Sequence, residues 1–73
     1  MTKEEAARNL GARLGNSVVV TFEILDQLHT YTAKLVGVSL KGIKLEGLFW
    51  LYFEGPIKIK RVSIEKEVIY RAP

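Results

Sequence analysis

The first part of the chain has the apolar spacing of a helix. The apolar residues that recur at this spacing are Ala6, Ala7, Leu10 and Leu14. Thr2 and Glu5 have the spacing of a capping box at the start of such a helix, and Gly15 is placed to end it. We therefore predict one short helix over residues 3 to 14, which lies on a surface that the rest of the chain supplies.

From residue 17 onward apolar and polar residues alternate, and many of them are β-branched or aromatic, which is typical of strands. The alternation predicts five strands, over residues 17–25, 30–39, 43–53, 57–64 and 68–70. The predicted turns between them lie at residues 26–29, 40–42, 54–56 and 65–66. Near Gly37 the alternation changes face, so we expect the second strand to bend there.

The predicted elements define the fold class. One N-terminal helix followed by five short strands, with bends in the second and the third, indicates a mainly β protein that closes into a small SH3-like barrel. A chain of 73 residues has room for one small domain. We expect this single domain to span residues 1–73, with the helix at about 3–14 and the barrel at about 17–71.

Composition excludes several classes of protein. The chain has no cysteine and one histidine, so neither disulfides nor a zinc cluster stabilise its core. The longest run without a charged residue, Leu14 to Phe22, has nine residues, whereas a membrane span needs roughly 20. The first five residues lack the apolar core of a signal peptide. We expect a cytoplasmic protein without a membrane partner.

No arrangement of residues in the sequence indicates catalysis. His29 lies three residues after Asp26 in a predicted turn, and no serine and carboxylate combine with it into a nucleophilic site. A metal site needs several convergent ligands, which one histidine and scattered acids do not provide. We therefore expect a protein that is not an enzyme and has no cofactor.

The net charge of +3 arises at the end of the chain. Residues 1–55 carry six basic and six acidic side chains, whereas residues 56–73 carry five basic and two acidic ones. The basic residues of the predicted fourth strand are Lys58, Lys60 and Arg61. A basic segment attracts nucleic acid, because phosphate neutralisation supplies most of the affinity that is independent of sequence. Lysines on strand edges also block unwanted pairing, and the sequence leaves both interpretations open.

A run of aromatic residues ends the predicted third strand. Phe49, Leu51 and Phe53 share one face of this strand, and Trp50 and Tyr52 share the other. These rings either fill the core and a subunit interface or form a stacking platform for nucleic-acid bases. We expect core and interface, because a chain this small has one core to fill and leaves apolar surface for a partner.

Three segments carry a resemblance to a known family. They are Gly15 to Val20, Ala33 to Gly37 and Val62 to Ile69. The first looks like a G-x-x-V-x-V motif, the second is similar to a G-x-L-x-G motif, and the third is similar to a motif in which an I-R-G triplet separates the last two strands. With the order of helix and strands, they resemble the Sm-like (LSm) family of ring-forming RNA-binding proteins, as a divergent member of archaeal type.

The resemblance implies a site at the pore of a ring. It places the turns that carry Lys41 and Lys66 near the pore, where these lysines would contact phosphates, while the basic residues of the fourth strand add a broader surface. The family holds a uracil base with Asp and Asn, where this chain has residues 39–43, and it has Arg-Gly where this chain has Glu65 and Lys66. The usual hydrogen-bonding side chains of the base pocket are therefore missing.

Three functional hypotheses follow. The first is a Sm-like homo-oligomeric ring, of six or seven copies or of stacked rings, that binds RNA or single-stranded nucleic acid without sequence preference. The second is a structural, protein-interacting ring that has lost RNA binding. The third is an SH3-like barrel that coats duplex DNA as a chromatin protein. For a ring, we expect residues 57–64 of one copy to pair with residues 68–70 of the next.

Overall fold

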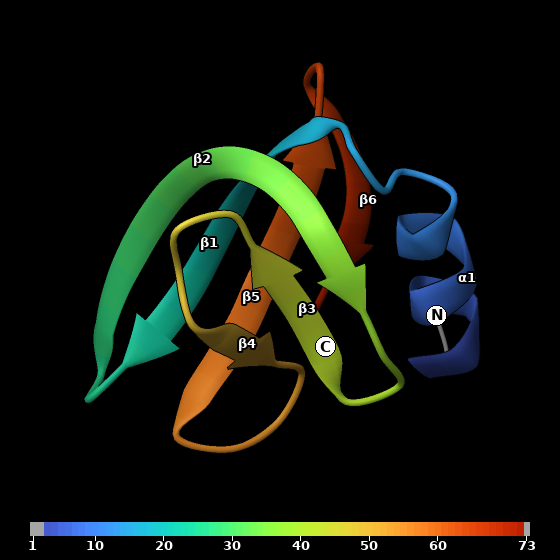
Figure 1. Cartoon of the computed structure of the whole chain (residues 1–73). Helices are drawn as coiled ribbons and strands as arrows, with labels where there is room; N and C mark the ends of the chain where they lie inside the picture. Colours follow the sequence, from blue (N-terminus) through green and yellow to red (C-terminus); the bar gives the residue numbers. More distant parts are fainter. Residues whose placement is uncertain (1–2, 73) are drawn as a thin grey trace.

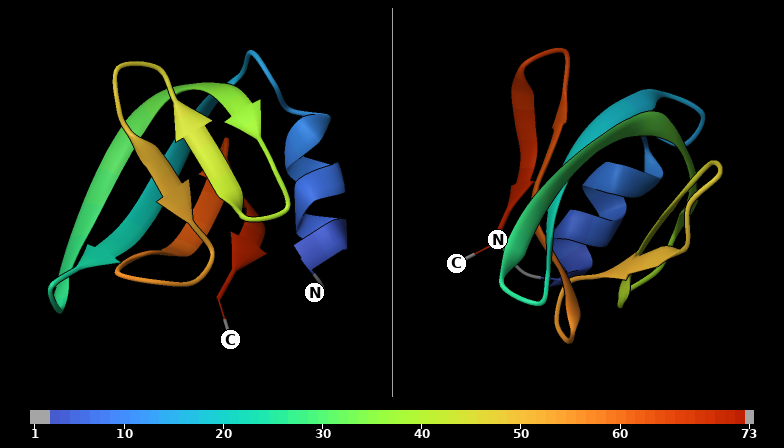
Figure 2. Two further views of the ribbon diagram at one scale, coloured as in Figure 1. Left: turned by 60° about the horizontal axis from the view of Figure 1, so that its bottom comes forward. Right: turned by 90° about the vertical axis from the view of Figure 1, so that its left-hand side faces the viewer.

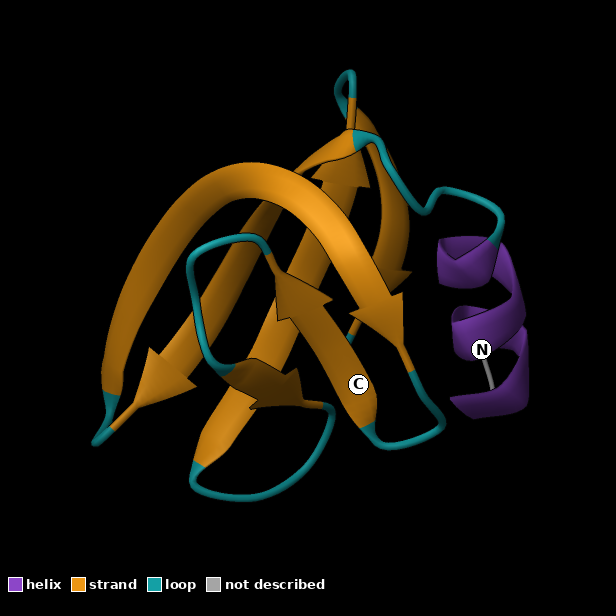
Figure 3. Cartoon of the chain, viewed as in Figure 1, coloured by secondary structure: helices purple, strands orange, loops and turns teal. Residues whose placement is uncertain are grey.

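The fold is built from one helix and six strands within residues 3–72, the part of the chain that the structure, a computed structural model, describes (Figure 1; Figure 3). The elements in chain order are α1 (Lys3–Gly11), β1 (Ser17–Ile24), β2 (Gln27–Val38), β3 (Gly42–Leu45), β4 (Trp50–Tyr52), β5 (Ile57–Ile64) and β6 (Glu67–Arg71). The alternation of the sequence is realised in β1, where Val18, Val20 and Phe22 are buried. One face of this strand therefore packs on the core.

The strands form one sheet that closes on itself. Each strand pairs with the next in the order β1-β2-β3-β4-β5-β6, and β1 also pairs with β5. The β4–β5 pair is parallel and the others are antiparallel. Five strands thus make a closed barrel, and β6 extends the sheet beyond it (Figure 2). This confirms the predicted class, a mainly β protein with an N-terminal helix and a small barrel of the SH3-like or Sm-like kind.

The long strand β2 bends where the sequence predicted a bend. Its residues 27–34 pair with β1 and its residues 35–38 pair with β3. The register shifts between Leu35 and Gly37, and the strand forms a wide arch in Figure 1. A Cβ on Gly37 would lie 3.1 Å from Cη2 of Trp50, so the tryptophan ring packs directly on the backbone of the bend.

The helix α1 covers one side of the barrel. Ala6 and Leu10 are fully buried, and the helix contacts β2 and β6. It ends at Gly11, earlier than the predicted residue 14, because the hydrogen bond from Arg13 N to Leu10 O tightens the chain into a turn. Thr2 of the predicted capping box lies outside the described residues. Between residues 3 and 72, no helix has both the length and the apolar character needed to cross a membrane.

The prediction of one continuous third strand over residues 43–53 is wrong. The chain forms two strands here, β3 and β4, which pair as an antiparallel hairpin with Ile43 opposite Leu51. Gly47 reverses the chain at a φ of 80°, and Lys44 donates a hydrogen bond to the carbonyl oxygen of Leu48 across the turn. Apolar residues on both sides of Gly47 led to the prediction of one strand, because they continue the apolar pattern across the turn.

The first hairpin turn is shorter than predicted. It consists of Leu25 and Asp26, which both have positive φ values, 50° and 64°, as in a type I′ turn. The predicted turn at residues 26–29 is therefore wrong, and β2 begins at Gln27. His29 lies in this strand, where its ring stacks on Phe22 with the ring centroids 5.6 Å apart.

One hydrophobic core fills the barrel and the space beneath the helix. The buried residues that form it are Ala6, Leu10, Val18, Val20, Phe22, Leu35, Ile43, Leu45, Leu51, Phe53, Ile59, Val62, Ile69 and Tyr70. Leu51 and Phe53 are among them, as predicted. Phe49, by contrast, is 49% exposed and precedes β4, so it is not part of this core.

Candidate nucleic-acid interface

The outer face of the sheet that runs through β2, β1, β5 and β6 carries polar side chains. Because cross-strand partners in an antiparallel sheet point to the same face, the register aligns residues into rows across the strands. Thr30 lies opposite Thr21, Thr21 opposite Arg61, and Arg61 opposite Arg71. We call this set the Thr–Arg row. It places two hydroxyl groups and two guanidinium groups side by side on one exposed face.

The two hydroxyls of the Thr–Arg row contact each other, while the two arginines lack an acidic partner among residues 3–72. The Oγ1 atoms of Thr21 and Thr30 are 3.4 Å apart. Arg61 and Arg71 are both exposed, and neither forms an ion pair with another described residue. Like charges directly opposite each other on a sheet are destabilising, so this pair costs folding free energy unless an anion lies over it.

A carboxylate, that of Glu23, lies beside the neighbouring lysines of β5. Glu23 lies opposite Lys58 in the β1–β5 register, and its Oε1 is 3.9 Å from Nζ of Lys60. Both members of the Glu23–Lys60 pair are about one-third exposed, so the pair contributes little to stability. Its electrostatic effect is local: Glu23 offsets part of the positive charge of Lys58 and Lys60, whereas the charge of Arg61 is not offset in this way.

A bulge in β5 turns Lys60 and Arg61 to neighbouring positions on the surface. The β1–β5 register shifts between Thr21 and Phe22, which pair with Arg61 and Ile59, so Lys60 is the extra residue. The bulge therefore breaks strict alternation in the basic segment. This break brings the predicted site residues of β5 close together on the outer face.

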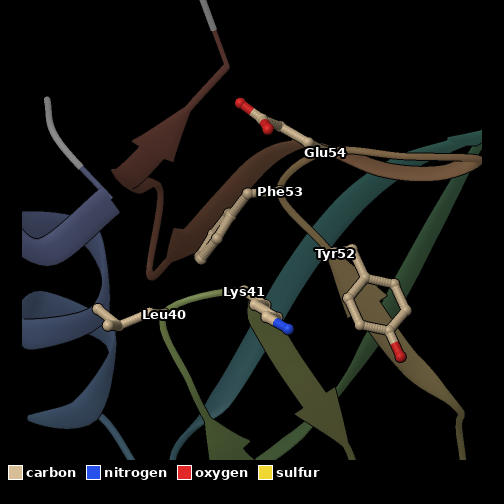
Figure 4. A pocket seen from close by; sticks show the side chains of 5 residues that line it. All are labelled: Leu40, Lys41, Tyr52, Phe53 and Glu54. Atoms are coloured by element: carbon tan, nitrogen blue, oxygen red, sulfur yellow. The ribbon is translucent and has the colours of Figure 1, made fainter.

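Lys41 lies elsewhere, in the turn between β2 and β3. The hydroxyl oxygen of Ser39 accepts hydrogen bonds from the backbone N–H groups of Lys41 and Gly42, both at 3.1 Å, and Phe53 N donates to Lys41 O at 2.9 Å. The Ser39 bonds fix the turn internally, and the Phe53 bond holds it against the segment that follows β4. The pocket between them is about 280 Å³ in volume and is lined by Leu40, Lys41, Tyr52, Phe53 and Glu54 (Figure 4).

Lys66 lies in the two-residue turn between β5 and β6. Glu65 and Lys66 both have positive φ values, 51° and 71°, as in a type I′ turn, which confirms the predicted two-residue step. In Figure 1 this turn is at the top of the molecule and the turn that carries Lys41 is at the bottom. Within one chain, the structure therefore does not bring Lys41 and Lys66 together.

The pairing that the sequence assigned to two copies occurs inside one chain. β5 pairs with β1 along one edge and with β4 and β6 along the other. A neighbouring copy can therefore pair with β5 only by displacing the chain's own β6. Within the described residues, the outer edge of β6 and the edge of residues 27–33 of β2 away from β1 are not paired with another strand.

Sequence reasoning missed two residues of this surface, Arg71 and Thr21. The register that sets Arg71 beside Arg61 depends on a second bulge, between Val62 and Ser63, which alternation along a single strand does not reveal. Thr21 carries no charge and enters the surface only through its cross-strand neighbours.

Known proteins give no further guide to this surface. Comparison with family models, with curated proteins and with solved structures finds no match to the chain.

Proposed function

We propose that this protein binds single-stranded nucleic acid, RNA above all, without sequence preference, and that it does so in the cytoplasm through the outer face of β5 and β6. The observation that carries the proposal is the cross-strand pair of Arg61 and Arg71, two exposed guanidinium groups without an acidic partner among the described residues. Guanidinium groups bind phosphate in a bidentate manner, and an anion over the pair would relieve its repulsion.

The surroundings of the arginine pair support a phosphate ligand. Hydroxyl groups of threonine and serine donate hydrogen bonds to phosphate oxygens in nucleic-acid complexes. Thr21 lies in register with Arg61, and Ser63 is two residues further along β5. Lys58 and Lys60 extend the positive surface along the same strand, where Glu23 weakens it.

The test compares arginine variants at equal change of net charge. Arg71→Gln should weaken binding of a labelled oligouridine several-fold, because it removes a phosphate contact. The loss of that contact should also lower the logarithmic salt slope by about 0.7. Arg8→Gln removes an exposed arginine of α1 and should leave binding unchanged. Fluorescence anisotropy over a range of salt concentrations measures both quantities.

Stability provides the second arm of this test. Since Arg61 and Arg71 repel each other, Arg71→Gln should leave the thermal midpoint unchanged or raise it, while it weakens binding. If Arg71→Gln binds oligouridine as the original chain does, the outer face is not the binding surface. If the original chain binds neither oligouridine nor mixed RNA at low salt, the protein-interacting alternative replaces the proposal.

We also propose that copies of this chain assemble into a Sm-like ring through their free strand edges. The sheet order places β2 at one end of β2-β1-β5-β6 and β6 at the other, so the edge of β6 in one copy can pair with the first half of β2 in the next. Exposed Leu28 and Val68 add apolar surface to these strands.

The ring proposal is tested by blocking one edge without disturbing the core. Val68→Lys places a charge on the exposed side of β6, where Val68 is 41% exposed, and should convert the ring to monomers in sedimentation velocity. Removal of residues 68–73 is a harsher variant, because it also removes buried Ile69 and Tyr70. A single small species for the original chain at micromolar concentration would contradict assembly.

A further inference from the structure

Tyr52 differs from the two residues beside it. Leu51 and Phe53 are buried, and the ring of Phe53 packs against Tyr70 with a centroid distance of 4.8 Å. Tyr52 is 40% exposed and lines the pocket at the end of β4. The core thus uses the side chains on either side of Tyr52, whereas the ring of Tyr52 is left on the surface.

The strand partners of Tyr52 leave one flank open and place a cation on the other. On β3 its partner is Gly42, which has no side chain to cover the ring. On β5 its partner is Lys58, and aligned residues of a parallel pair point to the same face of the sheet. The tyrosine ring therefore has a lysine beside it and an uncovered side.

Lys41 supplies a second cation next to the same ring. Lys41 and Tyr52 line one pocket, and in Figure 4 the amine of Lys41 points to the side on which the Tyr52 ring lies. The carboxylate of Glu54 points away from both, beyond Phe53. Lysines are thus present on two sides of an exposed aromatic face. The acidic group of the pocket is directed elsewhere, and Glu23, opposite Lys58, offsets only part of the charge of that lysine.

We infer that Tyr52 is a stacking platform for one unpaired nucleobase, with Lys41 and Lys58 placed to contact the phosphates on either side of that base. Aromatic side chains between basic residues bind single strands in this manner, since any base presents a flat face to the ring. A duplex covers its base faces by stacking and cannot use such a platform. The ligand of this site is therefore single-stranded. The inference rests on the proposed function and assigns it a second contact region.

Strand β5 connects this platform with the arginine surface. From Tyr52 the register leads to Lys58, and Lys58 and Arg61 lie on the same strand, β5. A strand of nucleic acid that stacks one base on Tyr52 can therefore continue along β5 toward Arg61 and Arg71. This path also gives Lys41 a role that does not require Lys66 nearby.

The experiment measures binding of a labelled oligouridine and of a mixed-sequence RNA duplex to matched variants at low salt. Tyr52→Ala should weaken oligouridine binding about tenfold and leave duplex binding unchanged. Tyr52→Phe keeps the aromatic face and should bind oligouridine within about twofold of the original chain. Tyr31→Ala is the matched control, because Tyr31 is similarly exposed, at 37%, and its strand partner is Val20. It should bind both probes like the original chain.

A lysine variant covers the case in which loss of the ring impairs folding. Lys41→Gln with Lys58→Gln changes two side chains outside the core and should weaken oligouridine binding more than duplex binding. Equal oligouridine binding by Tyr52→Ala, Tyr31→Ala and the original chain would overturn the stacking platform while nucleic-acid binding stands. Conversely, if Arg71→Gln binds normally and Tyr52→Ala does not, the arginine surface fails and the stacking platform stands.

Discussion

The corner where β2, β3 and β4 meet and the two tight hairpin turns place different demands on their residues. At the corner, a Cβ on Gly42 would lie 1.9 Å from the carbonyl oxygen of Leu51, so there is no room for a side chain. At the turns, four exposed residues have positive φ values, which glycine adopts at less cost than other residues. These four residues are Leu25, Asp26, Glu65 and Lys66.

The difference separates what the fold requires from what it tolerates. The chain does place glycine at other positive φ values, at Gly15, Gly47 and Gly55. The two hairpin turns depart from this usage and retain side chains at some cost in stability. Leu25 is 89% exposed, so its side chain contributes little to the core. Close packing therefore determines the residue at the corner, and stability alone does not account for the residues at the turns.

Gly42→Ala should have the largest effect on stability. The new methyl group would collide with the backbone of β4, which cannot move without disrupting the β3–β4 hairpin. We expect a loss of about 3 kcal/mol or more in the free energy of unfolding, a large fraction of the stability of a small domain. Chemical denaturation followed by circular dichroism measures it.

Gly11→Ala is the control for this substitution. A Cβ on Gly11 has no described atom within 4 Å apart from its local helix neighbours, and the residue ends α1, so alanine should raise stability by about 0.5 to 1 kcal/mol. Similar free energies of unfolding for Gly42→Ala and Gly11→Ala would contradict the close approach of β3 and β4 at this corner.

Replacement of the first turn should stabilise the protein. Leu25→Asn with Asp26→Gly introduces the residues that a type I′ turn prefers and should raise the free energy of unfolding by about 1 kcal/mol. Thermal unfolding measures the change. Loss of stability in this variant would mean that Leu25 makes a stabilising contact despite its exposure.

The second turn tests whether Lys66 has a function beyond the fold. Glu65→Asn with Lys66→Gly should stabilise the protein by a similar amount, because both turns have the same geometry. Should Lys66 contact phosphate, this variant should also bind oligouridine about twofold more weakly, with a salt slope lower by about 0.7. The first-turn variant, Leu25→Asn with Asp26→Gly, provides the comparison for oligouridine binding, because it has the same new turn residues and keeps Lys66. Tighter binding by the second-turn variant would show instead that Glu65 repels the ligand.

Much of the candidate surface could be predicted from the sequence, and its organisation could not. Lys58, Lys60 and Arg61 stand out as a basic segment in an alternating strand. Their arrangement depends on a bulge at Lys60, and their neighbours come from other strands: Glu23 lies beside the two lysines, and Arg71 lies opposite Arg61. Bulges are set by the partner strand, and one strand read alone contains no signal for them.

Local patterns by themselves determined the helix, the first strand, the bend at Gly37 and the two-residue step at Glu65 and Lys66. Periodicity and turn residues act over a few neighbouring positions, so the chain carries this information in short segments. Tertiary structure decided the hairpin of β3 and β4 and the meeting of Arg61 with Arg71. Each of these depends on which strands lie next to each other, and pairing between distant segments is decided by the packing of the whole barrel.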